Sequence, residues 1–151
     1  FREGLEGTVA AMAARRATPK DIAALEKLID RARLYVAKGI PQWRRFVEID
    51  RQIHQALAQV TGNPMYIVVN QMIHDNIQRY YERFLPWTEA MLQENFEDLR
   101  DIVALIKDRK EDAASTLARR HVQRFSEYMI ANEQKPAPLA EAAKDRLRPV
   151  Q

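Results

Sequence analysis

The stretch FVEIDRQIHQAL, residues 46–57, decides the fold because its apolar residues recur at helical spacing. Ile49, Ile53 and Leu57 follow steps of four and form one apolar stripe, as in an amphipathic helix. Asp50 and His54 lie beside that stripe and are also four residues apart. On a helix such positions differ by about 40° in angle and one turn in height, so a carboxylate and an imidazole can converge on one point. The stretch therefore predicts a core-packing helix with a polar pair next to the core.

The segments on either side also have helical periodicity. Proline fits the first turn of a helix, and prolines occur near the start of successive segments, at Pro19, Pro41, Pro64 and Pro86. Thr18 is a good N-cap, and Gly39 and Gly62 suit helix ends. We expect one helix before Pro19, then helices from Pro19 toward Gly39, from about Pro41 to Gly62 and from Pro64 toward Pro86. Two more carry the apolar stripes 92–106 and 114–128.

No segment alternates with a period of two, so the sequence predicts an all-α antiparallel bundle of about six helices. With 151 residues the chain fits one globular domain. We expect this domain over residues 1–132, followed by a tail or short extra helix over 133–151, a stretch that holds three prolines. Because the chain begins with Phe1 rather than Met, we also expect a segment upstream of it.

Composition excludes several classes of function. The chain has no cysteine, which excludes a disulfide framework, a thiolate nucleophile and a cysteine metal site. Its net charge of +3 comes from 24 basic and 21 acidic residues, and its basic doublets are scattered, unlike a nucleic-acid groove. No stretch approaches the roughly 20 apolar residues of a membrane span. We expect a cytoplasmic protein that does not contact the membrane.

Asp50 and His54 have the spacing of metal ligands, and His121 lies within the apolar stripe of the last predicted helix. If these two helices face each other, the three residues can offer one carboxylate and two imidazoles to a divalent ion. The alternative is that Asp50 and His54 hydrogen-bond each other at the margin of the core and that His121 is a satisfied core histidine. The spacing alone leaves both interpretations open.

Several motifs occur together in a characteristic order. The chain begins with the pattern R-x-x-L-E, at Arg2, Leu5 and Glu6, followed by AAMAARRATPKDIAAL at residues 10–25. The segments EIDRQIHQALAQVTGNP, residues 48–64, and DLRDIVALIKDRKEDAASTLARRH, residues 98–121, come later. Together they resemble the C-terminal effector-binding (FCD) domain of FadR-type GntR-family transcription regulators, over about residues 2–130. The resemblance implies a helical bundle that encloses a small-molecule pocket and forms a homodimer.

The resemblance also implies a divalent metal (zinc, nickel or manganese) at Asp50, His54 and His121. The remaining histidine of the family corresponds to Leu99, which cannot coordinate a metal. Three alternatives follow: a three-ligand site completed by water or effector, a pocket without metal, or a site completed by a neighbour such as His74, Asp98 or Asp101. Because three of the four ligands remain, we favour the three-ligand site.

Arg2 is a candidate partner for the carboxylate of an effector, because a guanidinium fork matches that group. The alternative is a solvated arginine near the chain end. Asn70 and His74 share a helical face and are candidates for lining the same cavity, the alternative being that at least one of them is exposed. We therefore take Arg2, Asn70 and His74 as the predicted effector-binding residues.

The resemblance implies a ligand-sensing regulatory domain, not an enzyme, that binds a small organic acid and acts on DNA only through an upstream winged helix-turn-helix domain absent from this chain. A metal-free acyl or apolar effector is the alternative. A helical metalloenzyme is a further hypothesis, although the chain lacks the Glu-x-x-His pairs of di-iron bundles. A third is a helical dimerisation module without a ligand.

Overall fold

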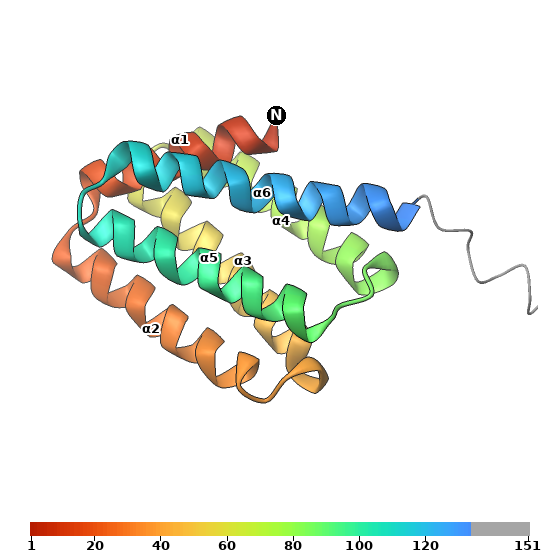
Figure 1. Ribbon diagram of the computed structural model, residues 1–151. Coiled ribbons are helices and arrows are strands. Elements are labelled where there is room, and N and C mark those ends of the chain that lie inside the picture. The colour runs from red at the N-terminus through yellow and green to blue at the C-terminus, as the bar shows by residue number, and fades with distance from the viewer. Residues whose placement is uncertain (134–151) are drawn as a thin grey trace, which may run out of the picture.

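The chain folds into six α-helices and one 3-10 turn in the computed structural model, which describes residues 1–133 without the side chains of 82–84, 132 and 133 (Figure 1). The helices are α1 (Arg2–Arg16), α2 (Pro19–Val36), α3 (Trp43–Val60), α4 (Pro64–Phe84), α5 (Glu89–Lys107) and α6 (Glu111–Glu133). Residues 1–133 contain no strand. The predicted all-α class and the six predicted helices are confirmed, whereas the predicted tail lies outside the described residues from 134 onward.

Local sequence sets the helix starts. Ahead of α2, the Thr18 hydroxyl accepts a bond from the Asp21 N–H (3.2 Å), and the Asp21 carboxylate accepts one from the Thr18 N–H (2.9 Å). This reciprocal capping box satisfies two donors that the first turn leaves open. The third predicted helix begins slightly later than expected, because Pro41 lies in the 3-10 turn η1 (Ile40–Gln42), which follows Gly39 at φ 72°. Gly39 adopts a left-handed backbone that disfavours residues with a Cβ.

The helices pack around a ring in the order α1, α6, α5, α2, α3 and α4, and α4 returns to α1. Figure 1 shows α6 lying along α1, with α2 on the opposite side of the bundle. α1 also contacts α3 and α5, so its inner face lies in the middle of the bundle. This close approach depends on small side chains, since Ala10, Ala13 and Ala14 on α1 are fully or almost fully buried.

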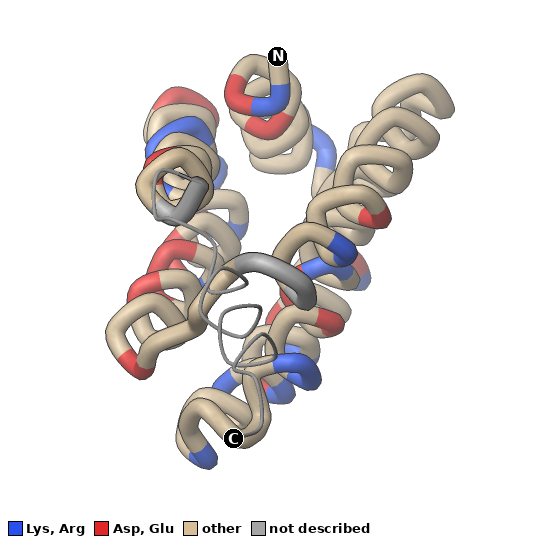
Figure 2. The backbone as a smooth tube through the Cα atoms, turned by 90° about the vertical axis from the view of Figure 1, so that its right-hand side faces the viewer, with Lys and Arg blue, Asp and Glu red and all other residues tan. Residues whose placement is uncertain are grey.

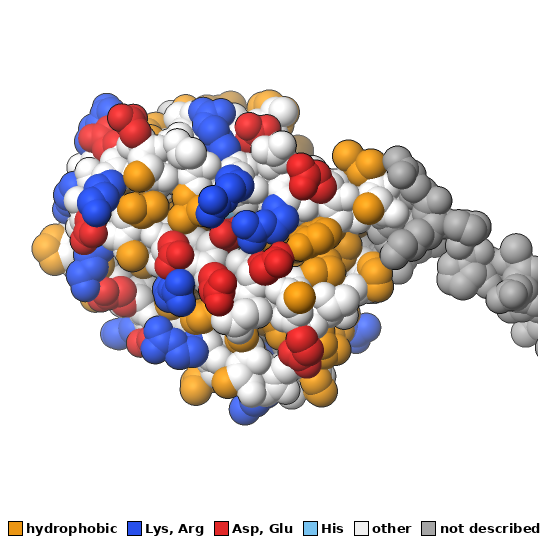
Figure 3. Space-filling model, viewed as in Figure 1, with side chains coloured by type: hydrophobic (Ala, Val, Ile, Leu, Met, Phe, Trp, Pro, Cys, Tyr) orange, Lys and Arg blue, Asp and Glu red, His pale blue; other side chains and the backbone are white. Residues whose placement is uncertain are grey.

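The described surface carries mixed charge. Both basic and acidic positions are scattered over the helices (Figure 2), and the face in Figure 3 interleaves blue and red side chains without a large patch of one sign. This distribution agrees with the near balance of charges in the sequence. Within the described part of the chain, each helix is either too short or too polar to cross a membrane.

Candidate metal centre

The structure brings the three predicted metal ligands together in the core. Asp50 and His54 project from α3 and His121 from α6, and one candidate ligand atom from each lies within 4.8 Å of the other two. All three residues are buried, with exposures of 5%, 2% and 1% respectively. The rings of His54 and His121 stack with their centroids 5.5 Å apart. α3 and α6 are not neighbours in the ring of helices, so these side chains meet across the interior of the bundle.

Glu6, on α1, lies at the centre of the polar interior. Its Oε2 accepts a hydrogen bond from His54 Nδ1 (3.0 Å) and a longer one from Asn70 Nδ2 (3.4 Å). Its Oε1 accepts from His74 Nε2 (2.8 Å). Arg2, one turn earlier on α1, forms an ion pair with the same oxygen at 3.5 Å. Glu6 therefore joins α1 to α3 and α4 through buried, charge-assisted contacts.

The charge state of Glu6 determines which ring nitrogen of His54 and of His74 carries the proton. Burial alone would raise the pKa of Glu6, but the charge of His54 and the hydrogen bonds from His54 and His74 outweigh it and hold that pKa well below its usual range. An ionised carboxylate only accepts hydrogen bonds, so His54 donates from Nδ1 and His74 donates from Nε2. In its neutral form His54 then carries a lone pair on Nε2.

That lone pair faces a second acceptor. His54 Nε2 lies 3.7 Å from Asp50 Oδ1. Within the described residues, both atoms are buried without a hydrogen-bond partner. We call these two atoms the acceptor pair. Two buried acceptors that face each other are unfavourable unless a cation, either a proton on His54 or a metal ion, lies between them.

The pKa directions of the three histidines fit this arrangement. Burial lowers the pKa of His54, but the neighbouring Glu6 and Asp50 carboxylates raise it more, so its pKa lies above the ordinary value. Burial lowers the pKa of His121 although its bond to Asp98 opposes the shift. Burial and the charge of His54 likewise lower the pKa of His74. His121 and His74 are thus favoured as neutral imidazoles, the form that binds metal, while His54 attracts a cation.

The donor set of Asp50, His54 and His121 therefore fits a divalent metal. It supplies one carboxylate oxygen and two imidazole nitrogens, a combination suited to zinc and other transition metals. Glu6, His54 and His74 also lie close enough to hold an ion. In that second group, however, the facing atoms already form hydrogen bonds of 3.0 Å and 2.8 Å. A metal there would have to displace protons that the carboxylate already holds in place.

Asp98, on α5, supports His121 from the other side. Its Oδ2 accepts a hydrogen bond from His121 Nδ1 (3.3 Å) and contacts Arg124 Nη1 at 3.0 Å. The Asp98 side chain is buried, and Arg124 compensates its charge. Asp98 therefore binds His121 by a hydrogen bond and does not belong to the group of Asp50, His54 and His121. It does not replace the missing family ligand in the way considered from the sequence. Asp101, the other acidic candidate on α5, is exposed and pairs with Arg100.

Leu99, the residue that the resemblance places at the missing ligand position, is fully buried in the hydrophobic core. His74, the third candidate replacement ligand, bonds to Glu6 and stacks on His54 at 4.3 Å between ring centroids. It belongs to the second group and not to the group around Asp50. The structure thus offers three protein ligands at the predicted site.

The effector candidates lie in the same interior. The expectation that at least one of Asn70 and His74 is exposed is wrong, because both are buried and both bond to Glu6. Arg2 is not solvated either, since its side chain is only 14% exposed. Among the described residues, Arg2 Nε and Nη1 have no hydrogen-bond partner. The guanidinium also bonds to Tyr81, and burial raises the pKa of that phenol to about 12.

Sequence reasoning missed the role of Glu6, which it used only as part of a motif. The available signal was its position on α1 between Leu5 and Val9, which belong to the apolar stripe of that helix. A charged residue beside such a stripe, with an arginine four residues earlier, is a candidate for a buried ion pair. Its partners on α3 and α4 depend on helix packing, which the sequence does not specify.

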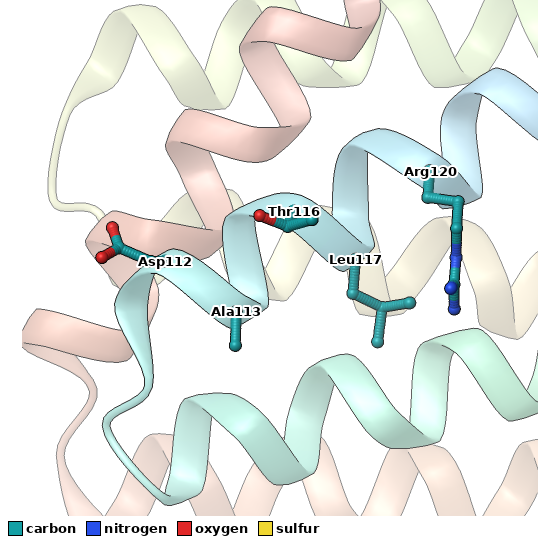
Figure 4. A pocket seen from close by; sticks show the side chains of 5 residues that line it. All are labelled: Asp112, Ala113, Thr116, Leu117 and Arg120. Carbon is teal, nitrogen blue, oxygen red and sulfur yellow. The ribbon is translucent and has the colours of Figure 1, made fainter.

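A surface depression of about 370 Å³ is lined by Asp112, Ala113, Thr116, Leu117 and Arg120 of α6. Figure 4 shows Ala113, Leu117 and Arg120 extending toward α5. None of these five residues belongs to the histidine groups. We therefore do not assign the effector to this depression.

The comparisons identify the family. The FCD domain family matches residues 1–124, and the chain belongs to this family. A comparison with curated proteins by sequence finds no match. The predicted recognition is therefore confirmed for the FCD domain, while the FadR-type subfamily stays a prediction.

Two solved structures share the fold. Streptococcus agalactiae GntR has a TM-score of 0.69 and 24% identity, and the match covers 81% of this chain and 53% of that protein. E. coli McbR/YncC has a TM-score of 0.75 and 18% identity, and the match covers 88% of this chain and 62% of that protein. The present chain thus spans about half to three fifths of the length of these relatives.

Proposed function

We infer that this chain is the ligand-sensing regulatory domain of a GntR-family transcription regulator and that it binds a divalent metal through Asp50, His54 and His121. Its membership in the FCD family supports the regulatory role. The observation that carries the metal assignment is the acceptor pair, formed by Asp50 Oδ1 and His54 Nε2 at 3.7 Å. A metal held by these three residues would supply a Lewis-acidic centre for a ligand oxygen.

We propose that the effector is a small organic acid, whose carboxylate a metal held by these residues would bind. Arg2 is the residue of this chain best placed to neutralise a second anionic group. Its guanidinium is buried beside the site, and Nε and Nη1 lack hydrogen-bond partners within the described residues. Buried arginine donors favour carboxylates because the planar fork matches their two oxygens. Asn70 and His74 support the Glu6 end of this network.

Regulation follows from differential binding. An effector changes DNA binding only if it binds one arrangement of the full regulator better than another. Glu6 and Arg2 lie on α1, so the polar network extends from the metal ligands to the first helix. We propose that α1 transmits occupancy to an upstream DNA-binding domain in a homodimeric regulator. This role needs binding and conformational change rather than turnover, which favours a sensor over an enzyme.

The first experiment is a titration of chelator-treated protein with Co²⁺ and Zn²⁺, followed by metal analysis and visible absorption of the cobalt form. We expect about one ion per chain. Asp50→Asn removes a charged ligand and should weaken binding at least tenfold, whereas Asp101→Asn, which changes an exposed carboxylate, should not. At alkaline pH, where His54 is neutral, Asp50→Asn should leave the metal-free protein at least as stable as before, because a buried charge that faces an acceptor is removed.

A protein that binds neither ion would contradict the metal proposal. The alternative would then be a metal-free effector domain, which the burial of Leu99 in place of a ligand favours. That outcome would direct ligand screening toward acyl and other apolar compounds. Equal cobalt affinity in Asp50→Asn and wild type would instead move the metal to another group of residues.

A further inference from the structure

His54 and His121 lie on different helices, yet both make the same kind of hydrogen bond. Each donates from Nδ1 to a buried carboxylate, His54 to Glu6 at 3.0 Å and His121 to Asp98 at 3.3 Å. We propose that Glu6 and Asp98 are positioning residues that fix both histidines in the Nδ1–H tautomer, so that each offers Nε2 to the ion beside Asp50. The inference rests on the proposed metal function and assigns to each carboxylate a role at the same site.

Glu6 is suited to this role because its orientation is fixed from several sides. Oε2 accepts from His54 and Oε1 accepts from His74, so rotation of the carboxylate would break one bond or the other. The ion pair with Arg2 keeps it charged in the core. A carboxylate held in this way imposes one proton position on each imidazole that it contacts.

Asp98 has the same relation to His121 through different neighbours. Arg124 Nη1 lies 3.0 Å from Oδ2, the oxygen that accepts from His121. Arg120 Nη2 approaches Oδ1 at 3.9 Å. The two arginines come from α6, the helix that also carries His121. α6 therefore supplies both His121 and the two arginines that hold the Asp98 carboxylate in place. This restricts rotation of the His121 ring.

The tautomer matters because a neutral imidazole has one donor and one acceptor nitrogen. If His54 carried its proton on Nε2, the N–H would point at the metal position and the Nδ1 lone pair would face the Glu6 carboxylate. In metal-bound protein both contacts would be repulsive, because the N–H would face a cation and the lone pair would face an anion. Hydrogen bonds from the distal nitrogen of a ligand histidine to a carboxylate also raise ligand basicity, and their loss typically costs about 10-fold to 100-fold in metal affinity.

The wild-type protein gives the first test, without any metal. The chain contains three histidines, so long-range ¹H–¹⁵N spectra of the imidazoles can be assigned with one substitution at each position. In metal-free protein at alkaline pH we expect the proton on Nδ1 in His54 and His121 and on Nε2 in His74. An Nε2–H tautomer in either His54 or His121 would overturn the proposal for the corresponding carboxylate.

The second test uses matched variants. Glu6→Gln and Asp98→Asn keep side-chain size but replace one acceptor oxygen by an amide donor. Glu3→Gln on α1 and Asp101→Asn on α5 are the controls, because both residues are exposed on the same helices. We expect Co²⁺ and Zn²⁺ affinity to fall about 10-fold to 100-fold in the two buried variants and to change less than about twofold in the controls.

A structural effect is separated from a positioning effect by melting curves and the imidazole spectra of each variant. The proposal requires a changed tautomer or a mixture of tautomers at the affected histidine in a variant that still melts cooperatively. Folded variants with unchanged metal affinity would refute it. If wild-type protein binds no metal, the proposed metal function fails, and the tautomer spectra still decide whether Glu6 and Asp98 set the ring protons.

Discussion

Two buried groups, each of one carboxylate and two imidazoles, share His54 but differ in their hydrogen bonds. In the group of Glu6, His54 and His74, the facing atoms form bonds of 3.0 Å and 2.8 Å. In the group of Asp50, His54 and His121, the acceptor pair lies at 3.7 Å without hydrogen bonds among the described residues. Burial and proximity alone would accept either group as a metal site. We favour the second as the proposed metal site, because its facing acceptors can share a cation, whereas the facing atoms of the first group already share protons.

The largest expected effect comes from His54→Ala, which breaks both groups. It removes a metal ligand and leaves Glu6 and Asp50 buried with fewer partners. We expect Zn²⁺ affinity to fall by at least about 100-fold and the free energy of unfolding of metal-free protein to fall by about 3 kcal/mol. Cobalt titration and urea unfolding measure the two effects. Retained affinity would show that the groups bind metal without the residue they share.

The pH dependence of metal binding tests whether a proton and a metal compete for His54 Nε2, the nitrogen of the acceptor pair. Glu6 and Asp50 raise the pKa of His54, so its proton stabilises the metal-free fold. That contribution is complete below the unfolded pKa of about 6.5 and is lost as pH rises through the higher folded pKa. The same proton competes with metal for Nε2, so Zn²⁺ affinity should decrease as pH falls, by about tenfold per unit below the folded pKa.

Asp50→Asn tests the cause of that profile. With one of the carboxylates that raise the pKa of His54 removed, the fall in Zn²⁺ affinity should begin at a lower pH than in wild type. Competition titrations at a series of pH values give both profiles. A decline that starts at the same pH in both proteins would mean that Asp50 does not act on the His54 proton.

His74→Leu disrupts only the hydrogen-bonded group. It leaves Glu6 Oε1 without its bond from Nε2, which should cost about 2 kcal/mol in the free energy of unfolding. Metal affinity should change less than about threefold, because His54 keeps its bond to Glu6. Thermal melting and cobalt titration test the two parts. A loss of affinity as large as that in Asp50→Asn would place His74 among the ligands.

The smallest effect is expected from Thr18→Ala, outside both groups. It removes the capping box at the start of α2 and should lower the free energy of unfolding by about 1 kcal/mol. Cobalt affinity should stay the same, because the substitution leaves both histidine groups intact. Urea unfolding with and without metal makes this variant a control for general destabilisation.

The secondary structure was predictable because its causes are local. Proline at helix starts, the N-cap at Thr18 and apolar steps of three and four residues all operate within a few turns of chain. The convergence of Asp50 and His54 was predictable for the same reason, since both lie on one helix. The contribution of His121 depended on how its helix packs, so the spacing left two interpretations open and the resemblance to a family favoured the metal site.

The network around Glu6 was not predictable from spacing. Glu6 meets His54 and His74 across 48 and 68 residues of chain, and the packing of α1 against α3 and α4 brings them together. The same packing buries Asn70 and His74, which sequence reasoning allowed to be exposed. Neither helical periodicity nor residue type specifies which of several polar residues will meet inside a bundle.

By itself, the sequence determined the helical class, the helix starts, and the presence of one carboxylate and two imidazoles suitable for a metal. Only the tertiary structure decided which ring nitrogen each histidine offers, because that choice follows from the buried carboxylate at its other side. Local spacing determines which side chains share a helix face. Proton positions depend on contacts between helices, which form only when the core is packed.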